Sequence, residues 1–435
     1  MDLDRLIDAA RSIQPDGVAV RDWRFYVTEG RRLSLGIKDR ETGNPNAPLT
    51  ISDSGAARYL LIWEDGRISR GHLERRQIED EPRSALEETL RAAYEDPDAA
   101  QVLGPQEPPQ VDLHDPHVAA LSRGESSSLV ERLGIVRERV SSAAVRTWSG
   151  SLSFSEGDAR LVTSAGLDVS GEGTSAGWHV TVNGEIGDGF SARKLESKTD
   201  FESRLDRLLE TSGRLEIEAP AMPGGRHRVI LHPRVVESYA LNTLLTNLEG
   251  ASVAHGEGHF RIDQFGSSTP LLREDLTLRL NPLEPMKSGS YRFTREGLPA
   301  ARCTFIDRGR LVQPVLDLKY ARRLGLAPTP VPYSADTLYL EGPPRLPLAR
   351  ALERAGAGAL VLSVLGVHTQ DSASGDFSLS APQALRIDGG GFTGKLKATI
   401  SGNLFDLLRS DTLEMVDFEG EHTPGLAIDC QLDPK

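Results

Sequence analysis

The sequence places two histidines four residues apart, His255 and His259, in the segment AHGEGHF (254–260). On a helix this spacing would bring both imidazoles to one face, where they could share a metal ion. Two glycines within the segment disfavour a helix, and in a strand the rings would lie about 13 Å apart, too far for one ion. We therefore predict a polar loop or edge strand, with a metal role as the weaker alternative.

The segment VVESYALNTLLTNLE, residues 235–249, has the apolar spacing of an amphipathic helix and lies between a short strand and a turn. A helix that binds zinc for hydrolysis carries two histidines on one face and a glutamate beside the first. The polar residues here include neither histidine nor cysteine: Glu237, Ser238, Asn242, Thr243, Thr246 and Asn247. By itself the pattern predicts a core helix.

The remaining motifs give no support for catalysis. The run Gly389-Gly390-Gly391 lacks the strand-to-helix context and the Lys-Ser/Thr ending of a phosphate loop, and it predicts a β-turn. No G-x-S-x-G motif occurs, and neither Cys303 nor Cys430 has a histidine in a recognisable local signature. The two cysteines form no C-x-x-C and are expected to be reduced core thiols. We predict no catalytic residue in this chain.

Composition excludes several classes of protein. The 435 residues carry a net charge of −13 and scattered basic residues, which argues against nucleic-acid binding. The acidic, amphipathic N-terminus is not a signal peptide, and no apolar run is long enough for a membrane span. Reduced cysteines suit the cytoplasm, where we expect the protein to reside.

The first part of the chain, residues 1–218, reads as an α+β domain with antiparallel sheets. Apolar periodicity predicts helices over 3–13 and 128–144, and alternating runs between them predict strands joined by turns. Two capping boxes predict further helix starts, Ser84 with Glu87 and Thr199 with Glu202, the second helix stopping at Gly213.

The turn APAMPGGRHR, 219–228, is the best candidate for a domain boundary. Beyond it, residues 219–435 are dominated by short strands, which predict a barrel or a curled antiparallel sheet. Helices are expected to be few: the helix over 235–249 and two more over 317–325 and 346–355.

Several stretches in order along the chain resemble the TldD/PmbA family. Residues 295–325, REGLPAARCTFIDRGRLVQPVLDLKYARRLG, give the clearest match. The other similar stretches are DGVAVRDWRFYVTEGRRLSLGIKD at 16–39, ARLVTSAGLDVSGEGT at 159–174, ASGDFSLSAPQALRIDGG at 373–390 and ISGNLFDLLRS at 400–410. The resemblance implies an N-terminal α+β domain and a β-rich C-terminal domain.

The metal-bearing branch of that family carries HExxxH on the helix before Leu-Glu-Gly, and a later cysteine completes its zinc site. Alignment on Leu248-Glu249-Gly250 places Leu241 at the first histidine, Asn242 at the glutamate and Thr246 at the second histidine, while His422 matches the cysteine. Leucine has no lone pair, asparagine accepts no proton at neutral pH, and threonine is a poor zinc ligand. The chain therefore resembles the metal-free PmbA/TldE branch.

The resemblance implies a heterodimer in which a TldD-like HExxxH subunit holds zinc and this chain holds no cofactor. Together the subunits would enclose a chamber that cleaves unfolded peptides, including leader peptides. One alternative is a stand-alone homodimer that binds peptides without protease activity. A third reading is an autonomous metalloenzyme with a site rebuilt from His255, His259 or His422.

Overall fold

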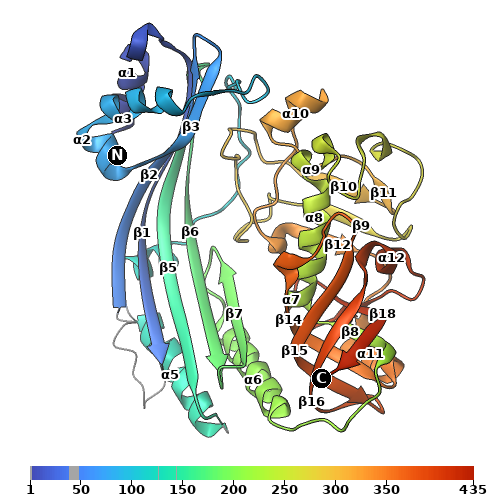
Figure 1. Ribbon diagram of the computed structural model, residues 1–435. Coiled ribbons are helices and arrows are strands. Elements are labelled where there is room, and N and C mark those ends of the chain that lie inside the picture. The colour runs from blue at the N-terminus through green and yellow to red at the C-terminus, as the bar shows by residue number, and fades with distance from the viewer. Residues whose placement is uncertain (1, 39–48, 126, 144) are drawn as a thin grey trace.

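The computed structural model describes residues 2–38, 49–125, 127–143 and 145–435. The chain forms two lobes (Figure 1). The N-terminal lobe, β1–β7 with α1–α6, is built on one long sheet, and the C-terminal lobe, β8–β18 with α7–α12, contains a barrel. The connection from α6 to β8 spans residues 216–224. The domain boundary at residue 219 falls within this connection and stays a prediction.

The N-terminal sheet has seven strands in the order β4-β3-β2-β1-β5-β6-β7, and every neighbouring pair is antiparallel. Alternating apolar and polar residues favour such strands because one face of each can be buried. The strands are β1 Val20–Lys38, β2 Leu49–Trp63, β3 Arg67–Glu74, β4 Tyr94–Glu95, β5 Trp148–Thr163, β6 Asp168–Val182 and β7 Ile186–Ala192.

Helices pack on one face of this sheet (Figure 1). Trp23 and Phe25 of β1 pack with α1 and α3, whereas Phe154 of β5 and Trp178 of β6 pack with α4, α5 and α6. These helices are α1 Leu3–Ser12, α2 Arg75–Asp80, α3 Pro82–Glu88, α4 Pro116–Ser122, α5 Ser127–Ser142 and α6 Lys198–Leu215. The opposite face of the sheet is turned toward the C-terminal lobe.

The barrel of the C-terminal lobe closes through five strands. The order β18-β16-β15-β14-β8 is completed by pairing of β8 with β18, and only β8 and β14 run parallel within this ring. Its strands are β8 Gly225–Leu231, β14 Gly358–Leu365, β15 Asp376–Asp388, β16 Gly391–Asn403 and β18 Gly425–Pro434, extended by β17 Glu414–Asp417 and β13 Leu346–Pro347.

A second, four-stranded sheet lies beside the barrel in the order β11-β10-β9-β12. Its strands are β9 Thr277–Leu280, β10 Cys303–Asp307, β11 Arg310–Leu311 and β12 Leu338–Glu341. The helices of this lobe are α7 Pro233–Val235, α8 Asn242–Leu248, α9 Gly250–His255, α10 Leu318–Leu324, α11 Leu348–Ala355 and α12 Leu404–Arg409. Short 3₁₀ helices span Pro15–Gly17, Thr89–Ala92, Ile262–Gln264, Ala335–Thr337 and Val367–Thr369.

The α+β class and the barrel-like C-terminal half predicted from the sequence are confirmed. The two predicted capping boxes are wrong. Helix α6 begins one residue after Ser197, whose Oγ accepts from the Asp200 N–H at 3.1 Å, and it continues to Leu215, past Gly213. Helix α3 begins at Pro82, because proline fits the first helical turn, so Ser84 lies inside the helix.

Other local predictions can be compared directly. Cys303 and Cys430 are free and buried, and burial raises the pKa of each thiol to about 12. Gly389 and Gly390 form the predicted turn between β15 and β16. The helix predicted over 128–144 is α5, although residue 144 lies outside the described residues. Within the described chain, no helix is both long and apolar enough to cross a membrane.

Candidate functional site

The segment predicted as a helix over 235–249 forms one continuous helix, which we call the motif helix (233–248). His232 caps its start, where the ring Nδ1 accepts from the Arg234 N–H at 3.3 Å. Residues 236–241 form a π-helical turn, which inserts an extra residue into the helical repeat. The amphipathic pattern predicted the helix, but nothing in the pattern indicated the π-helical turn.

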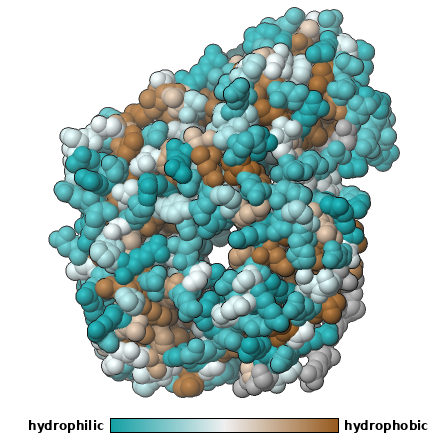
Figure 2. All heavy atoms as spheres, turned by 180° about the vertical axis from the view of Figure 1, so that it is seen from behind, coloured by the Kyte–Doolittle hydropathy of each residue, from teal (hydrophilic) through white to brown (hydrophobic). Residues whose placement is uncertain are grey.

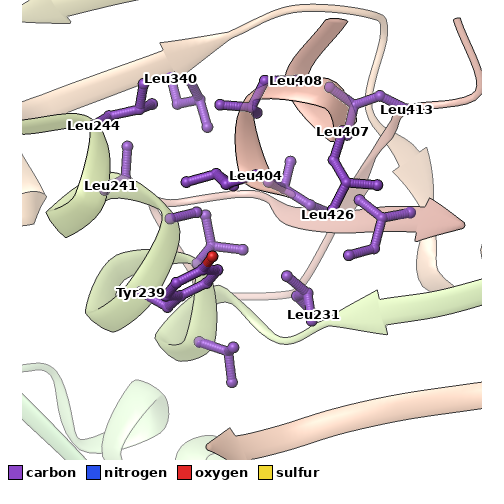
Figure 3. Close-up of a cluster of buried hydrophobic side chains, with 14 of the residues drawn as sticks. Leu231, Tyr239, Leu241, Leu244, Leu340, Leu404, Leu407, Leu408, Leu413 and Leu426 are labelled. Atoms are coloured by element: carbon purple, nitrogen blue, oxygen red, sulfur yellow. The ribbon is translucent and has the colours of Figure 1, made fainter. Parts of the chain in front are cut away.

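The first family position on this helix faces the core. Leu241 is 2% exposed and lies among other leucines, Leu244 of the same helix and Leu340, Leu404 and Leu408 of other elements (Figure 3). Burying a leucine side chain contributes about 1.5–3 kcal/mol. A histidine at this position would face an apolar cluster, and Leu241 contributes to core packing.

The other two family positions lie on the outer side of the helix. Asn242 is exposed, and Thr246 is half-buried. The Thr246 hydroxyl donates to the Asn242 carbonyl oxygen at 2.9 Å, a local bond that helix threonines commonly make. Neither side chain supplies a ligand or base of the kind that the family motif uses there.

His255 and His259 are held by different elements. His255 ends α9, because Gly256 adopts a left-handed conformation with φ of 66°, and its ring lies 5.9 Å from that of Tyr320 on α10. The ring of His259 stacks on Phe405 of α12 at 3.7 Å. The predicted loop is therefore correct from Gly256 onward, but the sequence did not reveal α9.

His422 lies beside the four-stranded sheet, where Nε2 is 2.8 Å from the Leu338 carbonyl oxygen. Burial lowers the pKa of His422 and also that of His259, where Arg409 adds to the effect. The described residues contain no group of three or more His, Cys, Asp or Glu side chains placed to hold a metal ion. The expectation that this chain carries no metal stays a prediction.

A cavity of about 920 Å³ opens beside the start of the motif helix and between the lobes. His232, Arg234 and Ser238 line it from the motif helix, while His179 and Asp188 line it from β6 and β7. The surface is also hollowed near its centre when seen from behind (Figure 2). The cavity is large enough to accept several residues of an extended chain.

Ion pairs between the lobes surround this cavity. Arg234 binds the Asp188 carboxylate and the Gly187 carbonyl oxygen. Further pairs between the lobes include Arg204 with Glu421 at 2.9 Å and Lys395 with Glu185 at 2.6 Å. These contacts join the two lobes beside the cavity.

The charged groups at this end of the helix have shifted pKa values. Burial lowers the pKa of His232 to about 4, although Glu421 acts in the opposite direction, so the ring is neutral near pH 7. Burial raises the pKa of the Glu237 carboxyl, against a hydrogen bond that Thr423 donates to it at 2.6 Å. Sequence reasoning missed this cluster because its members lie far apart in the chain.

The comparisons with known proteins agree with this geometry. Residues 224–427 match the model of the PmbA/TldA metallopeptidase C-terminal domain. No curated protein matches the chain.

Solved structures match along nearly the whole length. TldE from Thermococcus kodakarensis has a TM-score of 0.73 and 18% identity, over 95% of this chain and 97% of that one. A candidate modulator of DNA gyrase from Bacteroides thetaiotaomicron has a TM-score of 0.76 and 17% identity, with both chains fully covered. A candidate DNA gyrase modulator from Thermotoga maritima has a TM-score of 0.73 and 20% identity, over 99% of each chain.

The two-lobed fold and the matched C-terminal domain define a metallopeptidase-like protein. The C-terminal domain of this chain, residues 224–427, belongs to the PmbA/TldA metallopeptidase family, and the whole chain shares the fold of these three solved structures.

Proposed function

We propose that this chain is the non-catalytic, TldE-like subunit of a heterodimeric zinc metallopeptidase. The partner is a TldD-like subunit that carries HExxxH and the zinc ion. The substrate is an unfolded peptide, and this chain supplies part of the chamber wall.

One observation carries the proposal: this chain has the motif helix but not the metal-binding and basic side chains that the family motif places on it. The first family position, Leu241, is buried among leucines, and Asn242 and Thr246 offer neither a metal ligand nor a general base. The fold that TldE shares over 95% of this chain supports the same assignment. We therefore assign the motif helix a structural role.

A subunit without catalytic residues can still contribute to peptide cleavage. Extended peptides bind mainly through main-chain hydrogen bonds and pockets for alternate side chains, which require surface and shape. The 920 Å³ cavity between the lobes offers both polar and apolar lining, including Ser238, Leu360 and Phe418. One subunit can therefore provide walls while its partner provides zinc.

The test is reconstitution with an HExxxH-bearing relative encoded in the same genome. We expect no cleavage of an unstructured peptide by this chain alone and cleavage on mixing, abolished when the glutamate of the partner's HExxxH is changed to glutamine. Elemental analysis should find zinc in the mixed complex and none in this chain. Chelator-sensitive cleavage by the purified chain alone would contradict the proposal.

The same preparation distinguishes the stand-alone alternative. A stable homodimer that binds peptides but gains no activity with any HExxxH partner would favour a peptide-binding protein instead. Light scattering of the chain alone and of the mixture separates the two outcomes.

A further inference from the structure

The two faces of the N-terminal sheet differ in composition. Leu161 and Val169 pack against Phe293 of the C-terminal lobe, so their face is turned toward that lobe. Registers of β1, β2, β5 and β6 show which other residues share it. Most are small: Thr28, Gly30, Ser34, Thr50, Ser52, Ser54, Ala56, Ser153, Ser155, Gly157, Ala159, Gly171, Gly173, Ser175 and Gly177. We call this the inner face.

Charge is segregated between the faces. Residues 26–34 of β1 are in register with positions of β2, β5 and β6. Among these described residues, the inner face carries Arg32 and Arg58 and no acid. The acids of the same stretch point to the helix-covered face. There Glu156 binds Arg123 at 2.8 Å, and Asp168 binds Arg160 at 2.7 Å.

A cavity of about 440 Å³ lies on the inner face, and two further arginines line it. Four acidic residues whose strand positions belong to the helix-covered face also border it: Glu29, Glu156, Asp158 and Glu172. Arg193 follows β7, and its Nη2 donates to the Ser290 carbonyl oxygen at 2.6 Å. Arg292 comes from the C-terminal lobe and donates to the carbonyl oxygens of Pro109 at 3.2 Å and Ser170 at 3.0 Å. Tyr26 and Tyr291 add aromatic walls.

Glycines of β6 allow these guanidinium groups to lie on the sheet. A Cβ at Gly173 would stand 2.8 Å from Nη1 of Arg193, and a Cβ at Gly171 would lie 3.8 Å from Cδ of Arg292. Any larger side chain at Gly173 would have to displace the guanidinium. The inner face is therefore shaped to hold the two arginines in the cavity.

Neither arginine has a carboxylate partner among the residues that the structure describes. Their hydrogen bonds go to backbone carbonyls, and Nε of Arg193 is buried without an acceptor. Asp336 is the acid that acts on Arg193 electrostatically, but its oxygens accept from the Ser288 N–H at 2.6 Å and the Gly289 N–H at 3.0 Å. Burial lowers the pKa of Arg193, so an anion in the cavity would stabilise its charged form.

We propose that Arg193 and Arg292 bind a carboxylate of a peptide held against the inner face. Guanidinium groups bind carboxylates through paired, charge-assisted hydrogen bonds, and the unsatisfied Nε gives Arg193 a free donor for one of them. The carboxylate is either the peptide's C-terminus or an Asp or Glu side chain. This inference rests on the proposed function, because it requires that the lobes enclose a peptide.

The test measures binding of labelled peptides to the full-length chain by fluorescence anisotropy. One unstructured Ala/Ser decapeptide is made with a free C-terminus and with a C-terminal amide, and a third form is amidated but carries a central glutamate. We expect the best carboxylate form to bind about tenfold more tightly than the plain amide, as one charge-assisted interaction would give. The free-acid and glutamate forms distinguish the two sources of carboxylate.

Arg193→Gln and Arg292→Gln should each abolish most of that preference. Arg160→Gln is the matched control, since it removes the same charge from the opposite face of the sheet. Melting curves check folding, and Arg292→Gln keeps the test usable if Arg193→Gln fails to fold.

Equal affinity for the acid and amide forms would overturn this inference, and so would a preference that both variants retain. Neither result touches the proposed function, which the reconstitution assay decides separately. Failure of the chain to bind any of the three peptides would overturn the carboxylate site and weaken the role of this chain as a chamber wall.

Discussion

The two halves of the motif helix have different surroundings. From Leu241 onward the helix is packed into the leucine core of the C-terminal lobe (Figure 3). Its first turns, from His232 to Ser238, border the cavity between the lobes and carry charged groups with shifted pKa values. Both halves contribute to this core, since Val236 and Tyr239 are buried in it as well, but the cavity is lined by residues of the first turns.

We expect the largest loss of stability from a substitution in the half of the helix that packs into the core. Leu241→Ala should lower the free energy of unfolding by about 2–5 kcal/mol, because it removes buried methyl groups and leaves a cavity. Asn242→Ala, at the next position but exposed, should change it by less than about 0.5 kcal/mol. Urea denaturation of both variants measures the difference, and similar small losses would show that the helix is not core scaffold.

The cavity-facing half should control the response to acid. The folded pKa of His232, about 4, lies below its ordinary value of 6.5, so the unfolded chain binds the proton more tightly. Stability is therefore lost as pH falls from about 6.5 to about 4, by about 3 kcal/mol at most from this group. His232→Asn, which can still cap the helix, should flatten the loss.

Glu237 should change the pH dependence of stability in the direction opposite to that of His232. Its pKa is raised on folding, so it binds its proton more tightly in the folded state and gains stability as pH falls. Glu237→Gln should therefore steepen the acid loss seen in denaturation curves between pH 4 and 6.5. Identical pH profiles for wild type and both variants would show that these groups are not buried as described.

Sequence patterns predicted the parts of this molecule that depend on local periodicity. The helix over 235–249 and the turn at Gly389-Gly390 follow from spacing and from glycine's conformational freedom. The helix starts were missed because Ser84 and Thr199 fit a capping pattern that Pro82 and Ser197 override.

The cavity at the start of the motif helix could not be predicted in the same way. Arg234 meets Asp188 only because the C-terminal lobe lies against β7, and this contact has no signature in either local sequence. The inner face was more accessible to prediction. Small residues at every second position of β5 and β6, as in Ser151-Ser153-Ser155, indicate that one face of these strands does not pack against helices.

The smallest expected effect concerns the joint between the lobes, and it tests whether the cavity-facing half shapes the site. Arg234 is partly exposed and Asp188 is largely buried, so Arg234→Gln should cost about 1–2 kcal/mol, between the values for exposed and buried pairs. Arg350→Gln, in the exposed pair with Glu353 on α11, is the matched control and should cost less than about 0.5 kcal/mol. In the reconstituted complex, Arg234→Gln should slow peptide cleavage more than Leu241→Ala does at a temperature where both are folded. Loss of the Arg234 contact removes a link between the lobes beside the cavity, whereas Leu241→Ala changes only the packing behind it. If Leu241→Ala slowed cleavage more, the two halves of the helix would not divide packing from binding as their surroundings indicate.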